Sequence, residues 1–351
     1  PFIRENENPD LVVGVFHSGF DYTYGNRTAD TPKNENASQL VALNVPGFDI
    51  IFIGHDHKNW NETVNGVLIL GGQNAARSAP TATVTFTWNS DTKSYDKSIR
   101  GEVIDATQFE ADSDLMAQFA DQIQETKDYA GHKIGTFDAA TSSRDAMFGD
   151  SSFVDLIHEL QFDVAENTLG MKADISFCAP LQFDKTIDAG PVYVRDMYKL
   201  YKYENFLYLM TLTGQEIKNF LEYSYNLWMN QMSDENDHLL NFKEYDEATG
   251  NYDLAAKYYN YDSAAGIVYT VDVTKSEGER IAILGMDANL DGIVDEGSGF
   301  DLNKEYTCAI SSYRGGGGGG HLLAAGLTRE EVDSESRKVG QTERDLRYYL
   351  M

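Results

Sequence analysis

This 351-residue chain is poor in cysteine and in basic residues: it has two cysteines, and 28 Lys+Arg against 56 Asp+Glu give a formal net charge of −28. Cys178 and Cys308 both lie in apolar, strand-like runs, which favours buried thiols over a disulfide or a nucleophile. The excess of acid excludes a nucleic-acid polymer as a partner, because such a surface repels phosphate backbones. A small anionic substrate stays compatible if a metal ion or local cations reverse the charge within one cleft.

Long apolar runs are missing as well. The longest ones, such as 49–53, are far shorter than the roughly 20 residues that span a bilayer, so we expect no membrane span. Yet 42% of the residues are hydrophobic and 12% are aromatic, which excludes a disordered chain, and the length predicts two domains. The opening residues, Pro-Phe-Ile-Arg-Glu-Asn, have the pattern of neither a signal peptide nor a domain start, so we expect a preceding segment.

The first third of the chain has the pattern of a strand–helix–strand unit. Apolar runs at 11–16 and 48–53 predict buried strands, which end in loops carrying His17 and the sequence Gly-His-Asp-His at 54–57. Residues 36–45 leave room for one short helix between these strands. Further strands are expected at 67–70 and 81–88, and an amphipathic connecting helix is expected at 112–130.

A second α/β pattern begins near residue 133. Ser152-x-x-Asp155 and Thr213-x-x-Glu216 are capping-box patterns that predict two helix starts. Gly170 is expected to end the first of these helices. Strands are expected at 173–178, 206–212, 266–273 and 306–311. The predicted fold class is therefore mixed α/β throughout.

Three histidines follow strands that we expect to be neighbours. His55 and His57 are two residues apart, and an extended backbone would point both imidazoles the same way, toward a shared metal ion or two adjacent ions. His17 ends the preceding strand in the same manner, and ligands of open α/β sheets collect at the carboxyl ends of strands. A solvated His-x-His without function is the alternative, but the third histidine favours a metal site.

These residues carry a family resemblance. His17-Ser-Gly and Pro46-Gly-Phe-Asp-Ile-Ile-Phe-Ile-Gly-His-Asp-His57 resemble the later motifs of the two-metal phosphoesterase domain of secreted nucleotidases, and Asn34-Glu-Asn36 precedes them as in cyclic-nucleotide members. The resemblance implies two divalent metals such as Zn or Mn, one bound by His17 and His55 and the other by His57. Asp56 stands where the family has Ser or Thr, and an exposed charge without function is the alternative for it.

The rest of the chain resembles the C-terminal substrate domain of the same enzymes. The motifs that carry this resemblance are Ala173-Asp-Ile-Ser-Phe-Cys-Ala-Pro-Leu181, Tyr201-Lys-Tyr-Glu-Asn-Phe-Leu207, Leu212-Thr-Gly-Gln-Glu-Ile-Lys218 and Ser312-Tyr-Arg-Gly-Gly316. The implied architecture is the C-terminal part of a metallophosphoesterase α/β sandwich (1–110), a linker helix (111–132) and an α/β nucleotidase C-terminal domain (133–351).

The resemblance is greatest to the 2′,3′-cyclic-nucleotide 2′-phosphodiesterase/3′-nucleotidase branch. Residues 179–182 lack the arginine that 5′-nucleotidases carry, and Gly319 stands where they have an acid. That acid would accept hydrogen bonds from free 2′ and 3′ hydroxyls, and it would repel a cyclic phosphate, so its absence favours the cyclic substrate.

The resemblance also implies a nucleotide site, in which Tyr203 and Tyr313 stack on the base, Asn205 reads a base edge and Arg314 contributes to binding. Stacking tolerates the identity of the base, so broad specificity is expected. The alternatives are that the tyrosines only pack and that Arg314 is a surface charge. The glycines at 315–320 are expected to form a mobile loop or to let the backbone approach the nucleoside.

A further motif, Asp287-x-Asn289-x-Asp291-Gly292-x-x-Asp295, has the spacing of a calcium loop of EF-hand type, with Ile293 offering its carbonyl. Ser298 stands where the bidentate Glu belongs, and Glu296 or Asp301 are candidate substitutes. We expect either a structural calcium site or an acidic hairpin turn.

The function implied for the complete enzyme is metal-dependent hydrolysis of 2′,3′-cyclic nucleotides and 3′-nucleotides. The family's earlier motifs, including its catalytic histidine, would lie upstream of Pro1, so we expect this chain alone to be incomplete and weakly active. The alternatives are a 5′-nucleotidase or UDP-sugar hydrolase and a non-catalytic nucleotide-binding chain. The resemblance implies a periplasmic or cell-surface location, and the sequence does not decide the oligomeric state.

Overall fold

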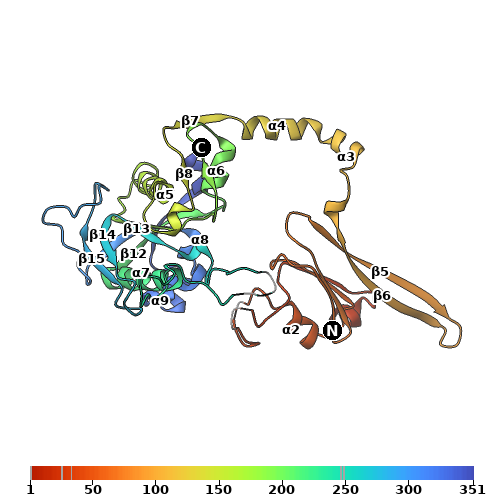
Figure 1. Cartoon of the computed structure of the whole chain (residues 1–351). Helices are drawn as coiled ribbons and strands as arrows, with labels where there is room; N and C mark the ends of the chain where they lie inside the picture. The colour runs from red at the N-terminus through yellow and green to blue at the C-terminus, as the bar shows by residue number, and fades with distance from the viewer. Residues whose placement is uncertain (1, 25–26, 33, 246, 248–249) are drawn as a thin grey trace. The chain divides into compact units, whose positions relative to one another are not determined.

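The computed structural model of the chain describes residues 2–24, 27–32, 34–245, 247 and 250–351. The chain folds as two units, Pro1–Ala120 and Asp121–Met351, coloured red to yellow and yellow to blue in Figure 1. In the part of the chain that is described, no helix is both long and apolar enough to cross a bilayer.

A four-stranded sheet of order β1-β2-β4-β3 forms the centre of the first unit. Its strands are β1 (Val13–Phe16), β2 (Ile50–Ile53), β3 (Trp60–Val64) and β4 (Val67–Gly71). Strands β1, β2 and β4 run parallel to one another, and β3 pairs antiparallel with β4 at the edge of the sheet. Helix α2 (Ser38–Asn44) connects β1 to β2, which confirms the predicted strand–helix–strand unit, and a short helix α1 (Phe2–Asn6) precedes it.

Two different elements cover the faces of this sheet. Ile51 and Ile69 pack with Ala42 of α2 on one face. On the other face, Leu70 packs against the long hairpin of β5 (Ser78–Asn89) and β6 (Ser94–Asp105), through residues that include Val84. Both faces of β2 and β4 are therefore largely buried, as unbroken apolar runs predict. The prediction of a buried strand at 11–16 is wrong for one face of β1, because Val13 and Val15 are 43% and 79% exposed at the edge of the sheet. A 3₁₀ turn, η1 (Ala106–Gln108), follows the hairpin.

The single connecting helix predicted at 112–130 is wrong, because two helices occur there. They are α3 (Ser113–Gln118) and α4 (Ala120–Ala130), and the chain leaves helical geometry between them at Phe119, with φ −104° and ψ 11°. Leu115 and Phe119, expected on a buried stripe, are 53% and 51% exposed. Helical spacing alone predicted that these side chains are buried. Because no other described part of the protein packs against them, tertiary contacts do not stabilise one continuous helix.

A five-stranded mixed sheet of order β13-β9-β16-β12-β17 organises the second unit. Its strands are β9 (Ile175–Cys178), β12 (Phe206–Thr213), β13 (Ser263–Ala265), β16 (Glu305–Ser311) and β17 (Lys338–Asp345). Three ribbons flank it: β7 (Lys133–Phe137) with β11 (Gly190–Tyr193), β8 (Thr141–Ser142) with β10 (Thr186–Ile187), and β14 (Ile267–Val271) with β15 (Ile281–Met286).

Helices pack on both faces of the large sheet. One core joins its strands to α7 (Gly214–Trp228) and α9 (His321–Ala325), and the other joins them to α5 (Ser152–Asp163), α6 (Val194–Leu200) and α11 (Leu346–Leu350). The remaining short helices are η2 (Asp145–Met147), η3 (Val164–Thr168), η4 (Tyr258–Asn260), α8 (Ser312–Gly315), η5 (Gly318–Gly320) and α10 (Arg329–Asp333). The mixed α/β fold class is confirmed.

One of the two capping predictions is confirmed. The amide of Glu216 donates to Thr213 Oγ1 at 3.2 Å, and the amide of Thr213 donates to Glu216 Oε2 at 2.7 Å. The box at Ser152 is wrong: α5 begins one residue earlier than that box requires, with Ser151 at the N-cap, and the Ser152 hydroxyl instead hydrogen-bonds Thr141 Oγ1 at 2.8 Å. Both Cys178 and Cys308 are free, buried thiols, as expected.

Candidate functional site

The carboxyl ends of β1 and β2 bring two of the three candidate metal ligands together. His17 follows β1 directly and His55 follows β2 by two residues, and these strands are parallel neighbours. Their imidazole rings lie 5.5 Å apart, centroid to centroid, at an angle of 81°. Nε2 of His55 is 3.5 Å from Oε2 of Glu35. His57 is exposed.

The loop that carries His55 and His57 has a strained backbone. Their φ angles are 73° and 56°, in the left-handed region that residues with a Cβ rarely adopt. Asp56 between them is held firmly, because its Oδ2 accepts hydrogen bonds from the amide of Phe20 at 3.0 Å and from Nε1 of Trp60 at 2.8 Å. Asp56 is thus a fixed structural acceptor and not the free surface charge considered for it above.

The donors at this edge do not amount to a two-metal centre. Among the described residues, no group of three or more His, Cys, Asp or Glu side chains is placed to hold a metal ion. Two imidazoles and one adjacent carboxylate are suitable donors for Zn²⁺, but a bridged pair of ions requires more ligands than these. The residues present therefore do not fit the metal centre of the complete family site.

Five aromatic side chains meet in the second unit, and we call them the aromatic cluster: Phe183, Tyr203, Tyr258, Tyr259 and Tyr313. Tyr259 is central, with its ring edge-on to Tyr203 (6.2 Å, 79°) and to Tyr313 (6.5 Å, 86°). Tyr258 contacts both Tyr259, at 5.8 Å, and Phe183, at 5.9 Å. The predicted stacking residues Tyr203 and Tyr313 therefore flank one common ring.

The cluster combines buried and accessible rings. Burial, and then the neighbouring tyrosines, raise the pKa of Tyr203 to about 12, so its phenol is neutral at physiological pH. Tyr313 is 46% exposed and Phe183 is 45% exposed. Exposed aromatic faces beside a half-buried phenol form a surface on which a flat, uncharged ring system can stack.

Arg314, expected to contribute to substrate binding, is only 2% exposed and is held by protein groups. Its Nη2 lies 2.5 Å from Oδ2 of Asp262 and donates to the carbonyl of Tyr259 at 2.9 Å. Its Nη1 donates to Oδ1 of Asn260 at 3.2 Å and to the carbonyl of Gly318 at 2.6 Å. This geometry makes Arg314 a positioning residue that ties the central tyrosine to the glycine-rich segment.

The glycine-rich segment is folded into short helical turns, α8 and η5, rather than the mobile loop that composition suggested. Gly319 has φ +71°, and a Cβ built on it would lie 2.1 Å from Nη1 of Arg314 and 2.5 Å from Oδ1 of Asn260. Glycine at this position lets the backbone pass directly over the buried guanidinium.

Asn205, the predicted reader of the base edge, follows Tyr203 of the cluster by two residues. Its side-chain Nδ2 donates to the hydroxyl of Tyr201 at 3.4 Å, and its backbone carbonyl accepts from the amide of Leu346 at 2.8 Å. The side chain is half-buried. Its backbone is therefore fixed, and its amide makes one long hydrogen bond.

The candidate calcium loop is closed by its own backbone amides. Asp287, 5% exposed, accepts from the amides of Asp291 at 3.1 Å and Gly292 at 3.0 Å. Asp291 accepts from the amide of Ile293 at 2.9 Å and from Nδ2 of Asn289 at 3.0 Å. Asp295 accepts from the amide of Ala288 at 2.8 Å. Within the described ranges these carboxylates do not converge as a metal-binding group.

Sequence reasoning missed four contributors to the aromatic cluster and its support. Tyr258 and Tyr259 lie in a tyrosine-rich run that continues to Asp262, Phe183 follows β9, and Asp262 pairs with Arg314 across 52 residues. The density of tyrosine at 258–261 is the one local signal that could have indicated the cluster.

Comparison with known proteins places the second unit in a family. The 5′-nucleotidase C-terminal domain family matches residues 133–325. The chain is 23% identical to the trifunctional nucleotide phosphoesterase protein YfkN of Bacillus subtilis, over 91% of this chain and 23% of that protein. It is 22% identical to a 2′,3′-cyclic-nucleotide 2′-phosphodiesterase/3′-nucleotidase of Yersinia enterocolitica, over 95% of this chain and 57% of that protein.

A solved structure shares the fold. It is a putative 5′-nucleotidase from Staphylococcus aureus, crystallised in complex with α-ketoglutarate, which superimposes with a TM-score of 0.67 at 18% sequence identity. The superposition covers 99% of this chain and 62% of the Staphylococcus chain. The chain spans well under two thirds of the two curated relatives named above. With the family match covering more than half of its length, the chain belongs to the 5′-nucleotidase C-terminal domain family.

Proposed function

We propose that the aromatic cluster binds the base of a nucleotide, and that the complete protein hydrolyses nucleotide phosphoesters, chiefly 2′,3′-cyclic nucleotides and 3′-nucleotides. The observation that supports base binding most directly is the arrangement of Tyr203 and Tyr313, each nearly perpendicular to Tyr259. Tyr203 and Tyr313 would stack on the base, Tyr259 would limit its depth, and the amide of Asn205 would read its edge.

Arg314 supports this site through hydrogen bonds to the backbone. A guanidinium that bonds the Tyr259 carbonyl and the Gly318 carbonyl at once fixes the central ring relative to the segment that carries Tyr313. Because the positive charge is compensated by Asp262, it stabilises the protein without attracting phosphate. The stacking rings are thus held in place before the ligand binds, so the protein loses less conformational entropy on binding.

The preference for cyclic substrates is supported at Gly319. A side chain there would overlap the guanidinium of Arg314, so an acidic residue that bonds free ribose hydroxyls has no room in this packing. The Yersinia relative's name includes a 2′,3′-cyclic-nucleotide activity. A 5′-nucleotidase activity is the second candidate, because the Staphylococcus structure that shares this fold is described as a putative 5′-nucleotidase.

His17, His55 and His57 would contribute to the divalent metal site of the complete protein, together with ligands that the described residues do not provide. The chain by itself is then expected to have little or no phosphoesterase activity. Export to the periplasm or cell surface follows from the same family relationship. A structural calcium ion in the 287–295 loop is a separate proposal, tested by whether millimolar Ca²⁺ raises the melting temperature.

Base binding is tested by titrating the chain with adenosine in a calorimeter. Stacking contributes roughly 1–3 kcal/mol per base, so Tyr203→Ala and Tyr313→Ala should each weaken binding roughly 5- to 150-fold. Tyr348→Ala removes a 57% exposed tyrosine outside the cluster and is the matched control. Equal affinities for wild type, Tyr203→Ala and Tyr313→Ala would refute the proposed site.

Substrate preference is tested with the full-length protein and added Mn²⁺ or Zn²⁺, by comparing phosphate ester hydrolysis of 2′,3′-cyclic AMP and 5′-AMP. We expect the cyclic substrate to be hydrolysed faster and His55→Ala to reduce the rate. Equal or faster release of phosphate from 5′-AMP would favour the second candidate.

A further inference from the structure

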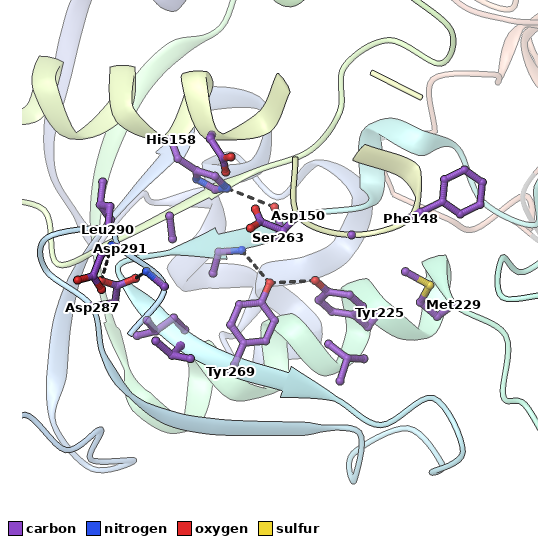
Figure 2. Close-up of a pocket in the computed structure, with 18 of the residues that line it drawn as sticks. Phe148, Asp150, His158, Tyr225, Met229, Ser263, Tyr269, Asp287, Leu290 and Asp291 are labelled. Atoms are coloured by element: carbon purple, nitrogen blue, oxygen red, sulfur yellow. Dashed lines mark hydrogen bonds between the residues drawn. The ribbon is translucent and has the colours of Figure 1, made fainter. Parts of the chain in front are cut away.

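A cavity of about 730 Å³ opens in the second unit, and its lining shares no residue with the aromatic cluster. This volume is typical of sites for small organic molecules, which range from roughly 300 to 1,000 Å³. Figure 2 shows its lining, drawn from α5, α7, β13, β14 and the 287–292 loop. Neither the family relationship nor the proposed nucleotide site accounts for it.

One wall of the cavity is apolar. It is formed by side chains from the end of α7, the segment after it, and the β14 ribbon: Met229, Leu239, Ile267, Val268, Val271 and Val273. Met229 and Ile267 are each 5% exposed and belong to the core, whereas the others are only partly buried. This wall could cover the hydrocarbon part of a ligand, which burial would stabilise.

The rest of the lining includes several polar side chains, and all the charged ones carry carboxylates. Asp150 precedes α5, Asp155 lies in its first turn and Glu159 lies one turn further along. Asp287 and Asp291 approach from the loop at the left of Figure 2. None of the described residues that line it is Lys or Arg. A nucleotide or any other anion is therefore excluded from this cavity by charge.

The carboxylates near α5 repel one another, and this repulsion destabilises the folded protein unless a cation lies between them. Burial, and then the neighbouring Asp150 carboxylate, raise the pKa of Asp155 to about 7. The adjacent His158 cannot serve as the cation: it is 3% exposed, and burial lowers its pKa to about 4. Its Nε2 is hydrogen-bonded to Ser263 Oγ at 3.2 Å, a bond drawn as a dashed line in Figure 2, so it contributes a neutral imidazole to the wall.

Neutral hydroxyls complete the lining. The hydroxyls of Tyr225 and Tyr269 are 2.9 Å apart and point toward each other in Figure 2, and the Tyr269 hydroxyl also accepts from the amide of Ala264 at 3.2 Å. They offer acceptor lone pairs without charge. A metal ion is a poor match for the acidic side, because within the described part of the chain no three such donors converge on one point.

We propose that this cavity binds an organic ammonium ion, whose hydrocarbon part lies against the valine and leucine wall and whose charge faces Asp150, Asp155 and Glu159. An ammonium group donates several hydrogen bonds to acceptors spread over a wide angle, so it does not require the tight convergence of a metal site. It also relieves the repulsion between the Asp150 and Asp155 carboxylates.

The test uses three probes that share a phenylethyl body, at pH 8, with dissociation constants measured by calorimetry or ligand-observed NMR: 2-phenylethylammonium, neutral 2-phenylethanol and 3-phenylpropanoate. The ammonium probe should bind roughly 10-fold or more tightly than the alcohol, since a charge-assisted hydrogen bond is worth about one such factor, and the carboxylate should not bind. Equal binding of ammonium and alcohol, or no binding of either, would overturn the proposal.

Two variants test whether the ammonium ion binds in this cavity. Asp155→Asn preserves the shape of the side chain and should weaken ammonium binding roughly 10-fold. Asp188→Asn removes the same charge from an exposed position outside the lining and should leave the affinity unchanged. Far-UV circular dichroism and the urea midpoint report whether each variant is folded. If the two variants lose equal affinity, the probe senses only overall charge, and the site is wrong.

Discussion

The carboxyl of Asp155 offers a direct test of these electrostatics, because replacing it should stabilise the protein. Its pKa is raised from 3.8 to about 7, first by burial and then by Asp150 and Glu159. The folded state therefore holds a proton more tightly than the unfolded state. Between pH 3.8 and about 7, the folded chain binds more protons, so the free energy of unfolding decreases as the pH rises through this window.

The size of the effect follows from the same values. A difference between 3.8 and about 7 corresponds to roughly 4 kcal/mol at 1.36 kcal/mol per pKa unit. The side chain is only partly buried, so solvent screening reduces the expected effect to about 1–2 kcal/mol. Asp155→Asn has no proton to lose and should be about 1–2 kcal/mol more stable than wild type at pH 8, with the difference vanishing below about pH 4.

Urea denaturation at several pH values, followed by circular dichroism, measures this difference. Asp150→Asn should relieve the same repulsion, and the double variant should gain less than the sum of the two single variants, because the two carboxyls share one interaction. Asp188→Asn is the control without a pH-dependent gain. A less stable Asp155→Asn at pH 8, or a gain that does not change with pH, would refute the reasoning.

Three further predictions concern buried groups. Arg314→Met should destabilise the second unit by about 3–5 kcal/mol, measured by urea unfolding, because it leaves the Asp262 carboxylate buried without its cation. Gly319→Ala, at φ +71° with a clash against Arg314, should be destabilised by more than Gly278→Ala, at φ +92° in open space; equal effects would show that strain alone matters. Burial lowers the pKa of His158 to about 4, so the contribution of His158 to the free energy of unfolding should fall by up to about 3 kcal/mol as the pH drops from 6.5 to 4, opposite in sign to the contribution of Asp155; His158→Gln should remove this contribution relative to wild type in urea unfolding.

Local sequence patterns determined much of the first unit and its metal-ligand candidates. Continuous apolar runs predicted the parallel strands, and parallel neighbours place their carboxyl ends at one edge, so the approach of His17 to His55 followed from topology. The capping box at Thr213 was equally predictable, because its partners are three residues apart. Each of these features depends on short-range chemistry or on a simple rule of sheet construction.

Only the tertiary structure decided which polar groups are buried and which rings meet. Arg314 and Asp262 are 52 residues apart, so nothing local distinguished a buried ion pair from a surface charge beside a glycine-rich segment. Tyr259 joins Tyr203 and Tyr313 only because three separate elements converge. The sequence by itself determined an acidic α/β protein with two histidines at a shared sheet edge. Long-range packing decided the aromatic cluster, the role of Arg314 and the acidic cavity, because burial depends on contacts between distant segments.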